Sequence, residues 1–349
     1  MEIPSAFKVK ELSQIFDISS PAISQKLKNL SDELLKSDKN RTVGIPRETT
    51  SKLLSENGFK HFYRKNIFLA HTIVGGSSKT SFTWSIFNGF VRLSSRKNPC
   101  IIISTDSQAS IDDIALSGIS NPDEQHVLTD YFNKKVSLDE ILIPLNKEEN
   151  LWIIPSNLNN VFLDKSVEGP SKIKTEALRL LNDIYAKFPG TNPSLFIDTM
   201  PALSASTGSF ILAMAQLMDK FGPEEYNPVV CIPLRSDSTS LKGCEIAYSE
   251  MRNIINTFNL TQSPSVKIFL ANYDKRLSLS NEILKLLFSN SELSPHVAQT
   301  VIRTSSEIPK ASYQKLSIYH NKTPVVANDY TELLLEILGQ QKPGVGAKH

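Results

Sequence analysis

Short apolar runs alternate with longer amphipathic segments through most of the chain. The apolar runs lie at 67–74, 99–104, 151–154, 194–198, 228–233 and 266–271. Helical spacing of apolar residues occurs between them, at 79–93, 173–187, 206–220, 240–258 and 278–288. Strands that are apolar along their whole length and alternate with helices are typical of a parallel sheet covered on both faces. The pattern predicts an α/β fold, with a mostly parallel sheet flanked by helices, whereas residues 107–147 predict no clear element.

Residues 1–66 follow a different pattern. Apolar residues recur at helical spacing in two short runs within 9–30, and the turn between the runs reads DISSPA. Ser20 can cap a second helix whose first turn holds Pro21. This predicts a small all-α domain with a helix-turn-helix, although an ordinary helical hairpin has the same pattern. We interpret 37–48 as a linker and 49–57 as another short helix.

The second predicted helix is polar and rich in hydrogen-bond donors, which favours DNA binding. Residues 1–66 carry twelve Lys and Arg against eight Asp and Glu, whereas the whole chain has a net charge of only +2. Ser24 and Gln25 lie at the start of this helix, where side chains reach base edges. Lys26 and Lys28 would contact phosphates. Any nucleic-acid binding must therefore come from local patches and not from the overall charge.

Several classes of protein are disfavoured by the sequence. The three cysteines lie far apart with no C-x-x-C spacing, which argues for a reducing compartment and against a disulfide framework. The six histidines show no metal-ligand spacing. The first residues lack an apolar signal segment, and the most apolar long stretch, 194–218, contains Asp198. We expect a cytoplasmic protein of 349 residues without a membrane segment and with a flexible tail at 341–349.

The stretch IFLAHTIVGGSSKTSFTWSI, residues 67–86, has the form of a phosphate-binding loop between a strand and a helix. Gly75 and Gly76 allow backbone N–H groups to approach an oxyanion, and the helix that begins at Lys79 adds its positive dipole end. Lys79 can reach the terminal phosphates of a nucleotide, and the Thr80 hydroxyl can complete a Mg²⁺ shell. Taken alone, the stretch also fits an ordinary strand–turn–helix.

The general loop pattern G-x-x-x-x-G-K-[ST] is not fully met. Ile73 and Ser78 stand where that pattern has glycine. Two carboxylates nevertheless support a nucleotide site, because Asp106 and Asp198 each follow an apolar strand at its carboxyl end. Ligands of α/β sheets bind at that edge. The alternatives are a helix N-cap for Asp106 and a plain turn residue for Asp198.

Four segments together resemble the ParA family of partition ATPases, which belong with MinD to the deviant Walker-A group. These segments are VGGSSKTS, TDSQAS, FIDTMPAL and VVCIPLRSDSTSLKG, and they occur in the family's order and spacing. In that family the loop reads K-G-G-x-x-K-[ST], which accounts for the mismatch with the general pattern. The resemblance covers 67–340, and an N-terminal helix-turn-helix resembles the larger plasmid-type members that repress their own operon.

The resemblance implies binding of ATP and Mg²⁺, a nucleotide-dependent homodimer, nonspecific DNA binding on the nucleoid, and release by a ParB-type centromere-binding partner. The residues expected to hold the nucleotide are Gly75, Gly76, Ser77, Ser78, Lys79, Thr80 and Ser81. Thr80 and Asp198 would hold the metal. Lys79 and Asp106 would serve catalysis, with Asp106 orienting the attacking water.

The chain departs from the family at several positions. Val74 replaces the lysine that begins K-G-G and that, in the family, reaches the phosphates of the other subunit. Ser104, Ser107 and Met200 replace other motif residues. Loss of a cation that faces developing phosphate charge predicts weak hydrolysis, unless another cation substitutes. The sequence offers Arg235 and Lys242 as candidates.

Nonspecific DNA binding in the family uses basic residues near the C-terminus. Here the candidates are Arg303, Lys310, Lys315 and Lys322, interleaved with Tyr313 and Tyr319. A solvated helix face is the alternative for any one of these lysines. Two functions fit the sequence: a DNA-partition ATPase, or a regulator of the same group that binds ATP and barely hydrolyses it.

Overall fold

The computed structural model describes residues 6–28, 34–36, 42–59, 63–117, 125–157, 170–320 and 325–339. Lys322, the predicted tail at 341–349 and the last two residues of the predicted 9–30 motif lie outside them. No helix in the described ranges is long and apolar enough to span a membrane.

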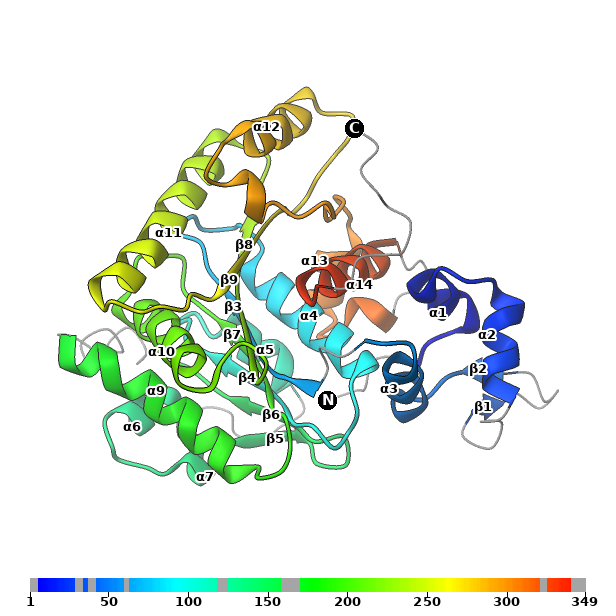
Figure 1. The fold of residues 1–349 in the computed structure, drawn as a ribbon, viewed down its shortest axis with the longest axis horizontal. Coiled ribbons are helices and arrows are strands. Elements are labelled where there is room, and N and C mark those ends of the chain that lie inside the picture. The colour runs from blue at the N-terminus through cyan, green and yellow to red at the C-terminus, as the bar shows by residue number, and fades with distance from the viewer. Residues whose placement is uncertain are drawn as a thin grey trace.

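A seven-stranded sheet forms the centre of the molecule (Figure 1). Its strands are β3 (Lys65–Ala70), β4 (Cys100–Ser104), β5 (Ile143–Asn146), β6 (Leu151–Ile154), β7 (Ser194–Asp198), β8 (Tyr226–Leu234) and β9 (Ser265–Leu270). They lie in the order β5-β6-β4-β7-β3-β8-β9. All neighbouring pairs are parallel except β5 and β6. The predicted mostly parallel sheet is therefore confirmed.

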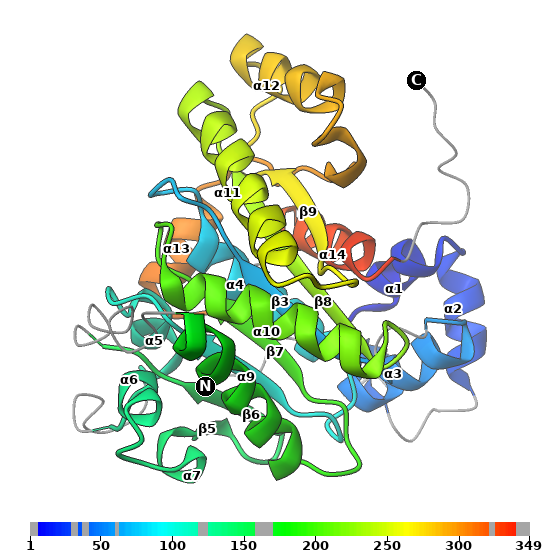
Figure 2. The same cartoon turned by 60° about the vertical axis from the view of Figure 1, so that its left-hand side comes forward.

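Helices cover both faces of the sheet (Figure 2). On one face lie α4 (Lys79–Leu93) and α14 (Val325–Ile337), and on the other lie α9 (Pro170–Lys187), α10 (Ala205–Phe221) and α11 (Ser238–Thr257). Successive strand residues alternate between the two cores: Phe68 packs with α4, whereas Ile67 and Leu69 pack with α10 and α11. This alternation explains why the strands read as continuously apolar.

The remaining elements lie around this framework. They are α5 (Ser110–Ala115), α6 (Leu128–Phe132), α7 (Leu138–Ile141), α12 (Ser278–Ser289), α13 (Glu307–Tyr313) and 3₁₀ turns at Ser294–His296 and Ile318–His320. The edge strand β5 and three of these helices lie in 107–147, which predicted no element. They are four to six residues long, too short to show a clear hydrophobic period.

The N-terminal region contains α1 (Val9–Phe16), α2 (Ser20–Leu27), β1 (Leu35–Lys36), β2 (Thr42–Gly44) and α3 (Arg47–Glu56). The prediction of an all-α domain is wrong, because β1 and β2 pair antiparallel and Phe7 bridges Ile45. The prediction of a linker at 37–48 is also wrong, since β2 and the start of α3 lie within this range. Strands of two or three residues are too short to show the alternation of apolar and polar residues that predicts a strand.

The two helices of the predicted motif do form, joined by a short turn in which Asp17 has φ 52°. The cap of the second helix differs from the prediction by one residue. Ser19 is the N-cap, and its Oγ accepts a hydrogen bond from the Ala22 N–H at 3.4 Å. Ser20 is the first helical residue, and its hydroxyl donates to the Ser13 hydroxyl at 3.3 Å.

The N-terminal region rests on the far end of α4, the helix that follows the loop (Figure 1). Arg92 of α4 is buried, donates to Glu11 at 2.9 Å, and stacks on the rings of Phe7 at 3.7 Å and Tyr319 at 4.7 Å. Buried Arg47 of α3 donates to backbone oxygens beyond the end of the same helix. One helix therefore connects the loop to the N-terminal region.

Candidate phosphate-binding site

The loop 71–78 follows β3, which lies between β7 and β8 in the sheet. Ala70, the last residue of β3, pairs with Asp198 on one side and Cys231 on the other. The backbone continues in register, because His71 N donates to Cys231 O at 2.9 Å. The segments that follow β7, β3 and β8 therefore meet at one edge of the sheet, and β4, which precedes Asp106, is the next strand beyond β7.

The backbone of the loop takes the shape of an anion cradle. Gly76 has φ +68°, and an added Cβ on Gly75 would meet nothing within 4 Å. Ser78 has φ +72°, which explains why the general pattern has glycine at this position. The Ser78 hydroxyl accepts a hydrogen bond from the Asn272 side-chain amide at 3.2 Å, which helps to hold the strained residue. The hydroxyl of Ser77 is buried without a hydrogen-bond partner among the described residues.

Lys79 and Thr80 open α4 directly after the cradle. Lys79 is buried, and this burial lowers the pKa of its ammonium group, while Asp198 and Asp106 act in the opposite direction. The Thr80 hydroxyl donates to Asp198 Oδ2 at 2.8 Å. Thr83, one turn further along, donates to Asp198 Oδ1 at 3.3 Å. Thr83 lies outside the loop pattern, so the sequence gives no signal for its role.

Asp198 is the last residue of β7 and is fully buried. It pairs with both Ala70 and Ser104, so the alternative of a plain turn residue is wrong. Burial raises the pKa of Asp198 to about 7. No cluster of three or more His, Cys, Asp or Glu side chains that could hold a metal lies within the described ranges. A Mg²⁺ ion here would need phosphate and water ligands besides Thr80 and Asp198.

Asp106 follows β4 and is buried. Its Oδ1 accepts a hydrogen bond from Gln108 N at 2.9 Å. The helix-cap alternative for Asp106 is wrong, because α5 begins at Ser110 with Ala109 at its N-cap. Asp106 and Asp198 both act electrostatically on Lys79. The structure therefore brings together the three charged residues that the sequence assigned to the site.

A buried network behind Asp106 was not predicted. Asp112 Oδ2 accepts hydrogen bonds from the hydroxyls of Ser104 at 2.9 Å and Ser156 at 2.8 Å. The Ser156 hydroxyl also lies 2.6 Å from the carbonyl oxygen of Asp106. Ser104 stands where the family motif has aspartate, and Asp112 places a carboxylate beside it from α5. The sequence could not show this, since 52 residues separate Ser104 from Ser156.

Val74 of the loop packs against α11, and Arg235 lies near Gly76 of the loop. A Cβ on Gly243 of α11 would lie 2.5 Å from Val74 Cγ2, so the valine occupies space that only a glycine at position 243 leaves open. Arg235 follows β8, and its Nη1 would lie 3.3 Å from a Cβ on Gly76. Lys242, the other predicted cation, is an exposed residue of α11.

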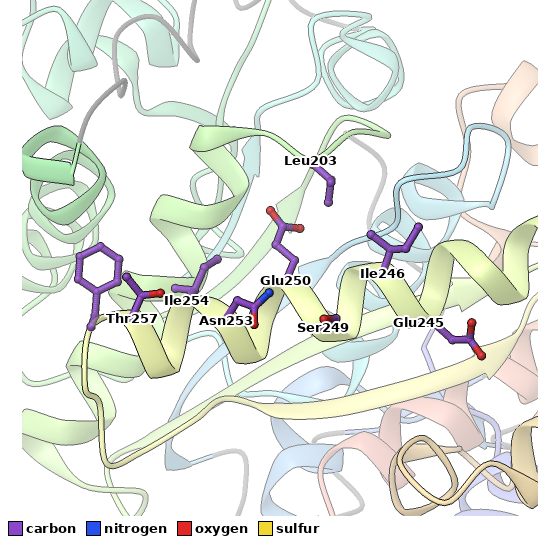
Figure 3. A pocket seen from close by; sticks show the side chains of 9 residues that line it. Leu203, Glu245, Ile246, Ser249, Glu250, Asn253, Ile254 and Thr257 are labelled. Atoms are coloured by element: carbon purple, nitrogen blue, oxygen red, sulfur yellow. The ribbon is translucent and has the colours of Figure 1, made fainter.

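A groove of about 530 Å³ lies beside this edge, between α11 and the loop after β7 (Figure 3). Glu250 rises from α11 toward the loop that carries Leu203. The groove also contacts the start of the phosphate loop, because Glu250 Oε2 lies 3.0 Å from His71 Nε2. Leu203 and Ile246 expose 55% and 37% of their surface there.

The predicted DNA contacts lie far from the loop in the sequence. Ser24, Gln25, Lys26 and Lys28 are all exposed on or directly after α2. Lys26 donates to the Asn57 side chain at 3.0 Å, and this bond is on the surface.

The C-terminal candidates differ from one another. Arg303 is held by the Asp329 carboxylate through two guanidinium nitrogens, and Lys315 pairs with Asp113 at 2.9 Å. Lys310 is exposed on α13, and Tyr313 exposes 89% of its surface. The predicted interleaving is wrong for Tyr319, which is buried against Arg92.

Solved structures share this fold at low sequence identity. McdA from Cyanothece, in complex with ATP, is 14% identical with a TM-score of 0.62, over 80% of this chain and 98% of that one. A proposed plasmid partition protein from Borrelia burgdorferi, bound to AMPPNP, is 16% identical with a TM-score of 0.60, over 79% and 99%.

Cobyrinic acid a,c-diamide synthase from Mycobacterium smegmatis, with ADP and magnesium, is 16% identical with a TM-score of 0.56, over 80% and 97%. No family model and no curated protein matches the chain. The similarity therefore establishes the architecture: this chain has the α/β fold of these nucleotide-bound proteins.

Proposed function

We propose that the site binds ATP with Mg²⁺ and hydrolyses the nucleotide slowly. The observation that carries this proposal is the Thr80–Asp198 hydrogen bond of 2.8 Å, formed beside buried Lys79 at the end of a positive-φ loop. The loop supplies N–H donors, Lys79 supplies charge for phosphate, and Thr80 with Asp198 supplies metal ligands. Proteins of the same fold bind ATP, AMPPNP and ADP with magnesium.

Each residue has a distinct role in this proposal. When bound, Mg²⁺ neutralises charge on the phosphate oxygens. Lys79 binds phosphate, and the negative charge of a bound phosphate would raise the pKa of its ammonium group, opposing the effect of burial. Asp106 holds the attacking water, and its backbone is fixed through the Ser156 bond. We expect slow hydrolysis, because Val74 has an apolar side chain at the position where the ParA family, which the motifs resemble, has lysine.

At the level of the cell, we propose a role in DNA partition. ATP would bring two copies together through the loop edge, where Leu203 and Ile246 are exposed. The dimer would bind DNA nonspecifically through Lys310 and its neighbours, and a ParB-type partner would trigger release. The face that bears Ser24, Gln25, Lys26 and Lys28 would contact an operator. This assignment rests on the resemblance of the motifs and on the shared fold.

A transcriptional regulator that binds ATP and barely hydrolyses it is the second candidate. The packing of Val74 against Gly243 favours the regulator, because the space around position 74 fits an apolar side chain. The two candidates differ in turnover. A partition ATPase should hydrolyse ATP faster with DNA and its partner protein, whereas a regulator should repress an operator without such stimulation.

The binding proposal is tested with fluorescent ATP and ADP analogues by anisotropy, with and without Mg²⁺. The full-length protein should bind both, and Lys79→Ala should weaken binding at least a hundredfold while the protein stays folded by circular dichroism. Lys310→Ala serves as a surface control and should leave nucleotide affinity unchanged. Equal affinity in the wild type and Lys79→Ala would contradict the assignment of the loop.

A further inference from the structure

Arg235 is the residue after β8, and β8 is the strand beside the one that leads into the phosphate loop. Its Nη1 would lie only 3.3 Å from a Cβ added to Gly76. The guanidinium group therefore lies against the loop glycine whose positive φ shapes the cradle. The stretch HTIVGGSSKT, residues 71–80, contains one lysine, Lys79, and no arginine.

The Asp237 carboxylate forms an ion pair with the Arg235 guanidinium group. Arg235 Nε lies 3.1 Å from Asp237 Oδ2, while Oδ1 of the same carboxylate accepts the Ser240 N–H at 2.7 Å and caps α11. Asp237 is therefore fixed by its own helix, and it engages the Nε side of the guanidinium. Arg235 remains 42% exposed, so the rest of its fork is accessible to a ligand.

A triphosphate in the loop needs more positive charge than one buried lysine supplies. Charge-assisted bonds from arginine to phosphate are short and directional, because the planar fork matches two phosphate oxygens. The neighbouring hydroxyl of Ser236 is buried without a hydrogen-bond partner among the described residues, as is that of Ser77 in the loop. Each of the two residues, Arg235 and Gly76, is therefore followed in the chain by a serine whose buried hydroxyl could bind a polar ligand.

We propose that Arg235 binds the terminal phosphates of the nucleotide that its own subunit holds. The proposal rests on the proposed ATP site and adds a residue to it. Because Arg235 and the loop belong to neighbouring strands of one sheet, the cation reaches the phosphates within a single chain. Arg235 would therefore act on the nucleotide without crossing a subunit interface.

The test compares the binding of ATPγS, ADP and AMP by isothermal calorimetry. Arg235→Ala should weaken ATPγS binding about ten- to a hundredfold, the effect of losing one hydrogen bond between charged groups. ADP should lose less and AMP less than twofold, because the contact is to the terminal phosphates. Arg235→Lys should recover part of the loss. An unchanged affinity for ATPγS, or an equal loss for all three nucleotides, would overturn the proposal.

Two further variants separate ligand binding from a structural role. Lys242→Ala removes the nearby exposed cation of α11 and should change ATPγS affinity less than twofold. Asp237→Asn keeps a good helix cap but removes the competing carboxylate. It should leave ATPγS affinity unchanged or raise it a few-fold. A loss of affinity in Asp237→Asn as large as that in Arg235→Ala would show that Arg235 only supports the turn.

Mixing two defective chains tests whether the contact is made within one subunit. Lys79→Ala and Arg235→Ala chains are combined at equal concentration, and ATPγS binding is measured. With Arg235 acting in its own subunit, no mixed dimer has a complete site and binding should stay weak. Recovery of binding would mean that the arginine reaches across, and would overturn the proposal. If the wild type itself binds no ATPγS, the proposed ATP site is wrong. If the wild type binds ATPγS and Arg235→Ala binds it equally well, the ATP site stands and only the role of Arg235 is wrong.

Discussion

The Thr80 hydroxyl donates a hydrogen bond of 2.8 Å to Asp198 Oδ2, and this bond joins the first turn of α4 to the end of β7. The hydroxyl shields a carboxylate that is fully buried. In the proposed site, Thr80 and Asp198 would hold Mg²⁺ through these same oxygen atoms, so metal binding would replace the hydrogen bond.

We predict that Asp198→Asn removes the effect of Mg²⁺ on nucleotide affinity. In the wild type, Mg²⁺ should raise the affinity for ADP and ATPγS at least tenfold at pH 8. In the variant the increase should be under threefold, while affinity in EDTA is retained, because Lys79 and the loop are intact. Thr83→Val is the matched control, since it removes only the weaker 3.3 Å bond to the same carboxylate.

The same site should depend on pH. Burial raises the pKa of Asp198 to about 7, so below that pH the ion must displace a proton. The gain in affinity from Mg²⁺ should therefore shrink as the pH falls from 8 to 6, and Mg²⁺ binding should release protons near pH 6. Calorimetry in buffers of different ionisation enthalpy measures this release. A gain that is constant with pH would contradict the role of Asp198 as a ligand.

Asp112 should make stability pH-dependent without any ligand. Burial raises the pKa of Asp112 to about 7, well above the ordinary value of 3.8 that applies in the unfolded chain. Between these values the folded state binds more protons than the unfolded state, so the free energy of unfolding falls as the pH rises through this range. Above pH 7 the folded protein must hold an ionised carboxylate whose Oδ1 has no hydrogen-bond partner among the described residues.

We therefore predict that Asp112→Asn stabilises the protein by about 1–3 kcal/mol more at pH 8 than at pH 5, since the whole three-unit shift corresponds to about 4 kcal/mol and part of it already acts at pH 5. Urea unfolding of the ligand-free protein at the two pH values measures the difference. Asp113→Asn is the control, because Asp113 is exposed and pairs only with Lys315 at the surface. Its effect should stay within about 0.5 kcal/mol at both pH values. Equal effects of Asp112→Asn at pH 5 and pH 8 would contradict the prediction.

Arg92 should control the attachment of the N-terminal region. Arg92→Ala removes the 2.9 Å bond to Glu11 and the stacking on Phe7, and we expect a cost of about 2–4 kcal/mol, because a partly buried charge loses its partner. Hydrogen exchange should rise over 6–28 and stay unchanged in β3 and β7. Arg252→Ala, which removes an exposed pair with Glu292, should have no measurable effect. Unchanged exchange over 6–28 in Arg92→Ala would show that other contacts hold the region.

The order of strands and helices could be predicted because each long helix or strand shows its own characteristic spacing of apolar residues. The predicted helix at 79–93 matches α4, and the predicted strands at 151–154 and 194–198 match β6 and β7. Asp106 and Asp198 could be assigned because strand ends of a parallel sheet share one edge. The features that could not be predicted have no local signal in the sequence. β1 and β2 are too short to show a hydrophobic pattern, and the Ser104–Asp112–Ser156 network depends on packing between distant segments.

The position of Val74 also depends on a contact between segments that are distant in the sequence. This contact provides a direct test of the loop conformation. Gly243 lies in the interior of α11, where alanine would ordinarily stabilise the helix by about 1 kcal/mol. Here a Cβ would lie 2.5 Å from Val74 Cγ2 and 3.3 Å from Ile73 Cγ1. We expect Gly243→Ala to displace the loop, to cost about 1–3 kcal/mol through overpacking, and to weaken ATPγS binding at least fivefold.

A second substitution should reverse the effect. Val74→Ala removes the methyl groups that the new Cβ meets, so the double variant should regain both stability and ATPγS affinity relative to Gly243→Ala alone. The two changes should therefore be non-additive by at least about 1 kcal/mol in a double-mutant cycle. Gly208→Ala in α10 is the matched control, because its nearest neighbour, Ile254 Cδ1, lies at an ordinary 3.4 Å. Additive effects of Gly243→Ala and Val74→Ala would mean that the valine does not rest on α11, and position 74 would then be free to accept the lysine of the resembling family.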